Sequence, residues 1–159
     1  MSAQAIMDHA PLGAIIRFSD GAPRPSDRFR RKLADWENRN DKGRLIRKEP
    51  PRIGKSLNYP GGFSLHLGDY GSNGVVVIKF TRSFQATTRL SFEIVDLPPP
   101  GSIRILRQVG EGEELEYLAP DAAAADEWLA RNHLAKVRIE TVGARASPLT
   151  HTAPVIVTS

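Results

Sequence analysis

Short alternating segments separated by turn residues fill the middle of the chain, and they limit its fold more than any other feature. Residues 63–67 alternate apolar and polar side chains, and residues 75–81 form a second strand-like segment. Asn73-Gly74 lies between them, and both residues accept the positive φ of the tight turn that joins hairpin strands. Three further segments have the length and composition of strands: 88–95, 103–109 and 114–118. The middle of the chain therefore predicts antiparallel sheet.

Two segments have helical rather than strand periodicity. Ser26 is a good N-cap and predicts a helix over 27–40, with an apolar stripe expected to face the core. That stripe consists of Phe29, Leu33 and Trp36, spaced i, i+4 and i+7. Asp121 caps a second predicted helix that ends near residue 132, and Pro120 excludes helix before it.

The order of the elements predicts one α+β domain. Shorter strands are expected at 13–18, 44–48 and 136–142, with a loop over 52–62. Because strands cluster while the helices stand near the two ends, we expect an antiparallel or mixed sheet of about five to seven strands with two helices packed on one face. The domain is expected to span residues 1–142, and residues 143–159 to form a C-terminal tail or an edge strand.

The chain contains no cysteine among its 159 residues, which excludes disulfides, thiolate metal sites and a cysteine nucleophile. A chain of this length buries enough surface to fold without a metal or a disulfide. The beginning of the chain does not have the pattern of a secretory signal, and no apolar run is long enough to cross a membrane. We therefore expect a cytoplasmic protein that does not contact a membrane.

Motifs for cofactor binding are incomplete. Gly54-Lys55-Ser56 resembles the end of a phosphate-binding loop, but the required earlier glycine is replaced by Glu49. Gly110-Glu111-Gly112 begins like a dinucleotide fingerprint, but Leu115 occupies the third glycine position. The four histidines do not have metal-ligand spacing. We expect no cofactor and no metal, and we assign no catalytic residue.

One enzymatic hypothesis stays open. His66 lies in a predicted strand, on the face opposite Leu65 and Leu67, and is a candidate general base with Asp69 or Tyr70 as its orienter. The glutamates between residues 111 and 116 are candidates to assist it. The simpler interpretation, which the single histidine favours, is a solvent-facing sheet residue beside a solvated acidic hairpin.

Charge is distributed unevenly along the chain, whose formal net charge is +4. Residues 17–55 contain thirteen Lys/Arg and six Asp/Glu, a net of +7, whereas residues 111–159 contain four and eight, a net of −4. The cations of the first third are mostly arginines, whose planar guanidinium suits phosphate and carboxylate. The basic first third and the acidic final third are also candidates to pair with each other inside the molecule.

The basic first third is the best candidate binding region. Arginines with a nearby aromatic ring are typical of nucleic-acid binders, so we expect contact with nucleic acid or another polyanion. The alternative is a protein-binding adaptor or inhibitor that contacts an acidic surface on a larger machine, with the helix over 27–40 as the docking element. The candidate residues are Arg24, Arg28, Arg31, Lys32, Arg39, Arg44, Arg47, Lys48, Arg52, Lys55 and Tyr59.

Overall fold

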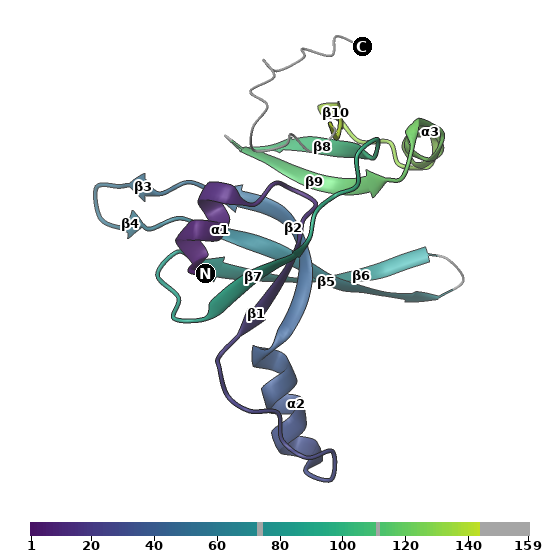
Figure 1. Cartoon of the computed structure of the whole chain (residues 1–159). Helices are drawn as coiled ribbons and strands as arrows, with labels where there is room; N and C mark the ends of the chain where they lie inside the picture. The colour runs from purple at the N-terminus through teal and green to yellow at the C-terminus, as the bar shows by residue number, and fades with distance from the viewer. Residues whose placement is uncertain (73–74, 111, 144–159) are drawn as a thin grey trace, which may run out of the picture.

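The computed structural model describes residues 1–72, 75–110 and 112–143, which form three helices and ten strands (Figure 1). The helices are α1 (Ala3–His9), α2 (Arg30–Arg39) and α3 (Ala122–Arg131). The strands are β1 (Ile15–Ser19), β2 (Asp41–Glu49), β3 (Arg52–Ile53), β4 (Asn58–Tyr59), β5 (Gly62–Ser72), β6 (Val75–Gln85), β7 (Ser91–Asp96), β8 (Ile103–Val109), β9 (Gly112–Ala119) and β10 (Val137–Thr141).

The main sheet is antiparallel, and β2 is its branching point. Its eight strands follow the order β10-β8-β9-β2-β1-β7, with β5 paired to β2 and β6 paired to β5. Along one edge, β2 pairs first with β1, from Asp41 to Arg44, and then with β9 at Arg47. Its other edge pairs with β5. One nine-residue strand therefore joins two parts of the sheet.

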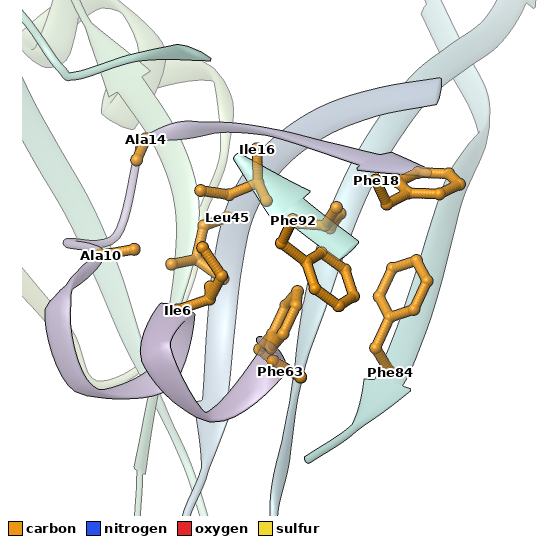
Figure 2. Packing of buried hydrophobic residues seen from close by; sticks show 11 residues of the cluster. Ile6, Ala10, Ala14, Ile16, Phe18, Leu45, Phe63, Phe84 and Phe92 are labelled. Atoms are coloured by element: carbon orange, nitrogen blue, oxygen red, sulfur yellow. The ribbon is translucent and has the colours of Figure 1, made fainter. Parts of the chain in front are cut away.

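Four phenylalanines fill the inside of the first part, which is made by β1, β2, β5, β6, β7 and α1 (Figure 2). The rings of Phe84 on β6 and Phe92 on β7 lie 5.2 Å apart between centroids, although these strands stand at opposite ends of the pairing order. Phe63 contacts both rings, and Phe18 contacts Phe84. The sheet is therefore strongly curled around an aromatic core. Each buried ring contributes about 1.5–3 kcal/mol of transfer free energy.

Helix α1 covers one end of this core and was not expected from the sequence. Ser2 caps it by accepting a hydrogen bond from the Ala5 amide, and Ala3 and Ile6 are buried. The chain terminus is held in place because the Met1 amino group donates to the Phe92 carbonyl over 2.7 Å. The hydrophobic positions of a seven-residue helix are too few to establish a helical period, which is why the pattern gave no prediction here.

A smaller core forms between β8, β9, β10 and α3. It contains Ile103, Ile105, Ala119 and Ala125, with Tyr117 and Trp128 among the half-buried residues packed against it. Helix α3 begins as predicted, because the Asp121 carboxylate accepts a hydrogen bond from the Ala124 amide over 2.8 Å.

The structure confirms an α+β fold dominated by antiparallel sheet and corrects its details. Among the described residues, the main sheet has eight strands rather than five to seven, and there are three helices rather than two. The predicted loop over 52–62 contains the short hairpin of β3 and β4. The turn predicted at Asn73-Gly74 lies outside the described residues, as does all of the predicted tail except Gly143.

The prediction that both helices pack on the sheet was wrong for α2. No residue of α2 is buried, and Phe29, expected to face the core, is 42% exposed. Helix α2 also begins at Arg30 rather than at Asp27, with Phe29 as its N-cap residue. The apolar stripe of α2 is narrow. The C-terminal end of the helix is attached to the sheet, and its N-terminal end projects away from the body of the protein (Figure 1).

Candidate functional site

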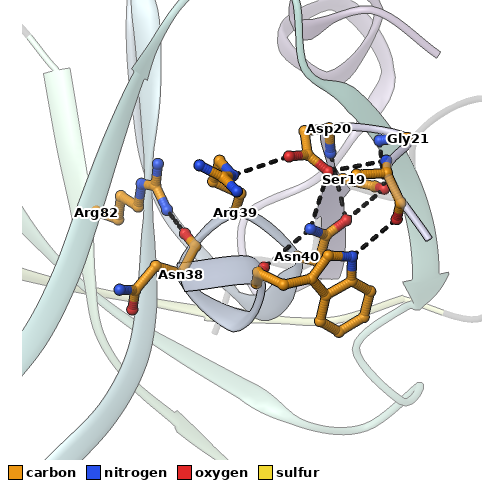
Figure 3. A network of polar contacts seen from close by, with 9 residues as sticks. Ser19, Asp20, Gly21, Asn38, Arg39, Asn40 and Arg82 are labelled. Atoms are coloured by element: carbon orange, nitrogen blue, oxygen red, sulfur yellow. Dashed lines mark hydrogen bonds and ion pairs between the residues drawn. The ribbon is translucent and has the colours of Figure 1, made fainter. Parts of the chain in front are cut away.

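A polar network at the C-terminal end of α2 joins this projecting helix to the sheet (Figure 3). Asn40 lies at its centre: its Nδ2 donates to Asp20 Oδ1 over 3.0 Å and to the Trp36 carbonyl over 2.9 Å. Its Oδ1 accepts from the Ser19 hydroxyl over 2.6 Å. Arg39 adds an ion pair to Asp20 at 2.9 Å. These bonds fix the direction in which α2 leaves the sheet.

Two further contacts attach α2 to the body. The Trp36 indole nitrogen donates to the Ala22 carbonyl over 2.8 Å, and an Arg82 guanidinium nitrogen on β6 donates to the Asn38 carbonyl. The Arg82 guanidinium also lies over the rings of Phe18 and Phe84 at the edge of the aromatic core. The C-terminal end of α2 is therefore well held, whereas the cation–ring contacts around its first turn, described next, are local.

The free end of α2 combines positive charge with an exposed aromatic ring. The Arg28 guanidinium carbon lies 4.7 Å from the centroid of the Phe29 ring, and the Lys32 ammonium lies 5.3 Å from it. Between residues 28 and 39 the chain has five cations and two carboxylates, a net of +3. Cations in the first turn of a helix are repelled by its dipole, so they do not stabilise α2 locally.

The predicted basic residues fall into separate groups in the structure. Arg28, Arg31 and Lys32 are exposed on or beside α2, where Arg30, which the sequence-based selection omitted, joins them. Arg24 pairs with Asp27, and Arg39 with Asp20. These residues do not share one surface with the cations of β2, because α2 stands away from the sheet.

The candidate cations of β2, which are Arg44, Arg47 and Lys48, are half-buried and contact other parts of the protein. Arg44 donates to the Gly13 carbonyl over 2.6 Å, and burial lowers the pKa of its guanidinium. Lys48 donates to the Met7 carbonyl at the end of α1 over 3.0 Å, and burial lowers its pKa as well. Arg47 pairs with Glu49 at 2.9 Å.

The remaining candidates lie around the short hairpin of β3 and β4. Arg52 is exposed, pairs with Glu49 at 3.8 Å and lies 5.6 Å from the Tyr59 ring centroid. Burial raises the pKa of the Tyr59 hydroxyl, and the Glu49 charge adds to this shift. Lys55 is exposed in the connection between the two strands.

The ion pairs of the acidic final third are formed within it or with the arginines of β8. In the described residues, the acidic final third pairs with its own neighbours: Arg107 with Glu116, Arg138 with Glu113 and Glu140, and Arg104 with Glu140. Among the described residues, no ion pair joins residues 17–55 to residues 112–143. The basic first third and the acidic final third therefore do not neutralise each other by direct ion pairs.

The structure brings His66 together with the carboxylates considered beside it. His66 Nε2 lies 2.6 Å from Asp69 Oδ1. The two residues share a cleft of about 390 Å³ with Glu114 and Glu116 of β9, more than forty positions later in the chain. Within the described residues, no group of three or more His, Asp or Glu side chains is arranged to hold a metal ion.

An apolar surface on the long β5–β6 hairpin was missed by the sequence reasoning. Tyr70, Ile78 and Phe80 are 66%, 49% and 52% exposed, and the register pairs Tyr70 with Ile78. The hairpin extends well beyond the body of the protein (Figure 1). The composition around these residues predicts strands. Whether another strand covers their side chains depends on the tertiary structure, which the local sequence does not report.

The described residues thus combine a projecting basic helix, a long exposed hairpin and a mixed-charge cleft in an α+β fold. No helix of the described residues has the length and apolar character required to cross a membrane.

The family model described as "Uncharacterised conserved protein UCP036055" matches residues 1–146. Since this match spans most of the chain, the protein belongs to that family. No curated protein and no solved structure matches the chain.

Proposed function

We propose that the protein is a binding protein that docks onto an acidic protein partner through α2. The observation that carries this proposal is that α2 projects from the sheet with an apolar stripe that is only partly covered: Phe29 is exposed, and Leu33 and Trp36 are half-buried. Apolar residues at i, i+4 and i+7 are the anchors with which a helix enters a groove on another protein. The cations around the stripe favour a groove with an acidic rim.

The cost of keeping this surface exposed supports the proposal. Phe29 is 42% exposed between two cations, and a first turn without a carboxylate gains nothing from the helix dipole. A partner that covers Phe29 and supplies carboxylates would stabilise both features. The exposed residues of the β5–β6 hairpin, Tyr70, Ile78 and Phe80, provide a second apolar contact surface of the kind that protein interfaces use.

Nucleic acid is the second candidate partner. The specific observation in its favour is the exposed Phe29 ring between Arg28 and Lys32, because a base stacks on such a ring while the cations contact its phosphates. A net charge of +3 between residues 28 and 39 is modest for this role. The apolar stripe, which phosphate contacts do not require, makes the acidic protein the preferred proposal.

The test compares two triple variants of the full chain. In one variant, Arg28, just before α2, and Arg31 and Lys32 on α2 are changed to Gln. In the other, three exposed cations away from α2 are changed to Gln: Arg52, Lys55 and Arg89. Partners are captured from the source organism by cross-linking to the wild type and to each variant. The proposal is supported if the wild type captures one acidic protein, the control triple variant still captures it, and the α2 triple variant and Phe29→Ala do not.

Binding of a fluorescent 20-nucleotide single strand is measured in parallel at two salt concentrations. Binding that depends on α2 and weakens steeply with salt would replace the acidic protein by nucleic acid as the partner. If neither the captured proteins nor the oligonucleotide distinguish the α2 variants from the control, α2 is not a docking element and the proposal fails.

A further inference from the structure

The cleft that contains His66 lies between the two parts of the sheet, far from the free end of α2. Its floor is the outer face of β2, β5 and β6, opposite the aromatic core, and its wall is β9 with Trp128 of α3. In Figure 1, β9 and α3 stand above the β5–β6 hairpin. A volume of about 390 Å³ lies within the range typical of small-molecule sites.

A β-bulge places His66 and Asp69 on the same face of β5. In a regular strand, residues three apart point to opposite faces. The register of β5 with β6 shifts between His66 and Gly68, so that Leu67 is an extra residue and the alternation is reversed after it. Bulges of this kind are over-represented next to functional sites, where they redirect a side chain.

The strand register then assembles a row of polar side chains. Arg44 on β2 stands opposite His66 on β5, which stands opposite Thr81 on β6. The next polar pair along the hairpin is Asp69 with Lys79. Directly opposed side chains in neighbouring strands lie about 5 Å apart, so these residues form one cluster on the floor of the cleft.

Hydrogen bonds within the cluster orient its members. A carboxylate only accepts, so Nε2 of His66 carries the proton that it donates to Asp69 over 2.6 Å, and Nδ1 is left for another partner. Arg44 is held by the Gly13 carbonyl through one terminal nitrogen, and its half-buried guanidinium is poorly hydrated. The floor therefore presents two cations beside an imidazole: the held guanidinium of Arg44 and the ammonium of Lys79.

The wall of the cleft is partly acidic and partly aromatic. Glu116 is neutralised by Arg107, whose Nε lies 2.7 Å from its Oε1, although the two buried atoms are not aligned as a hydrogen bond. Glu114 adds a carboxylate near the cations. Tyr117 and Trp128 stack with their centroids 5.3 Å apart, and with Ile46 they provide the apolar lining.

We propose that this cleft binds a small molecule with one negative charge and a flat apolar group. Arg44 and Lys79 would hold the anionic group, which is of the carboxylate type, and Tyr117 and Trp128 would contact the apolar part. The carboxylates of Asp69 and Glu114 disfavour a second negative charge, so a monoanion fits better than a phosphate dianion. This site is independent of the docking function of α2.

The experiment is an NMR titration of the full, ¹⁵N-labelled chain with benzoate. Benzyl alcohol, benzylamine and phenyl phosphate are the neutral, cationic and doubly charged comparison compounds. Benzoate is expected to shift the amide signals of residues 66–69 and 114–118 and the indole N–H of Trp128. The indole of Trp36, on α2, serves as the internal reference and is expected not to move.

Two lysine variants separate a specific site from general charge attraction. Lys79→Gln is expected to weaken benzoate binding about tenfold, the effect of losing one charged contact. Lys55→Gln, the same change of an exposed lysine outside the cleft, is expected to leave the affinity unchanged. Glu114→Gln is expected to tighten benzoate binding, because it removes a repelling charge.

Three results would overturn the inference. Equal affinities in the Lys79→Gln and Lys55→Gln variants would exclude the cleft cations as the anion site. Binding of benzyl alcohol or benzylamine as tight as that of benzoate would exclude selection of an anion, and tighter binding of phenyl phosphate would exclude the preference for a monoanion.

Discussion

Asn40, where α2 ends, donates a hydrogen bond from its side-chain amide to the carboxylate of Asp20, just after β1, over 3.0 Å. The same amide group also reaches Ser19 and the Trp36 carbonyl, so one side chain connects the strand, the loop and the helix (Figure 3). Because α2 buries no residue, its position on the protein depends on such polar contacts more than on packing.

Asn40→Ala is therefore expected to loosen α2 without unfolding the protein. Hydrogen exchange of the amides of residues 30–39 is expected to accelerate, while the global free energy of unfolding changes by less than about 1 kcal/mol. Asn38→Ala is the matched control, because Asn38 contributes its backbone carbonyl to Arg82, and the substitution keeps that group. Unchanged exchange in α2 would show that the network does not hold the helix.

The attachment of α2 is expected to weaken in acid. Hydrogen bonds from Asn40 and from the Ala22 amide, and the Arg39 charge, lower the pKa of Asp20 below its ordinary value of 3.8. A carboxyl with a lowered folded pKa contributes stability that is present above its unfolded pKa and is lost as the pH falls through the folded pKa. Exchange of the α2 amides, corrected for intrinsic rates, is expected to accelerate as the pH falls below about 3.8.

Asp20→Asn provides the comparison for this pH dependence. The variant lacks the titrating carboxyl, so α2 is expected to be loosened already at neutral pH and to lose most of its acid response. An acid response as large in the variant as in the wild type would assign the effect to another group.

Phe63→Ala tests the aromatic core. Phe63 is 2% exposed and its ring contacts Phe84 and Phe92, so its loss leaves a cavity and is expected to cost about 3–5 kcal/mol in denaturant unfolding. Phe80→Ala on β6 removes the same atoms from a residue that is 52% exposed, and is expected to cost less than about 1 kcal/mol. Similar losses in both variants would contradict the assignment of the core.

We expect that only glycine fits at position 62, because β5 and β6 approach closely there. A Cβ at this position would lie 2.2 Å from the Phe84 carbonyl oxygen and 2.8 Å from the Tyr59 hydroxyl, so Gly62→Ala forces backbone to move. We expect a loss of about 2–3 kcal/mol in thermal or denaturant unfolding. Gly68→Ala on the same strand, where a Cβ would meet no atom within 4 Å, is expected to be nearly neutral.

Much of the secondary structure could be predicted because its signals are local. The strand predicted over 103–109 matches β8, and Asp121 caps α3 as expected. N-cap chemistry and strand alternation need only neighbouring residues, so they can be read from the sequence. The same local reasoning did not find α1, whose buried face contains too few residues to form a pattern.

The candidate surfaces could be predicted only in part. The basic character of residues 28–32 is visible in the sequence, but the separation of these cations from Arg44, Arg47 and Lys48 is not. The latter are half-buried because β2 is a shared strand that pairs with β1, β5 and β9. Strand pairing joins residues far apart in the chain, and composition does not report it.

Local periodicity, turn residues and the lack of cysteine by themselves determined an α+β fold rich in antiparallel strands, with a basic first third. Only the tertiary structure decided that α2 projects with no fully buried residue and that His66, Asp69 and Glu116 line one cleft. The physical reason is that exposure of a helix face depends on what else packs there. The meeting of distant side chains likewise depends on strand register and on one bulge, and these are set by the balance of long-range contacts across the whole sheet.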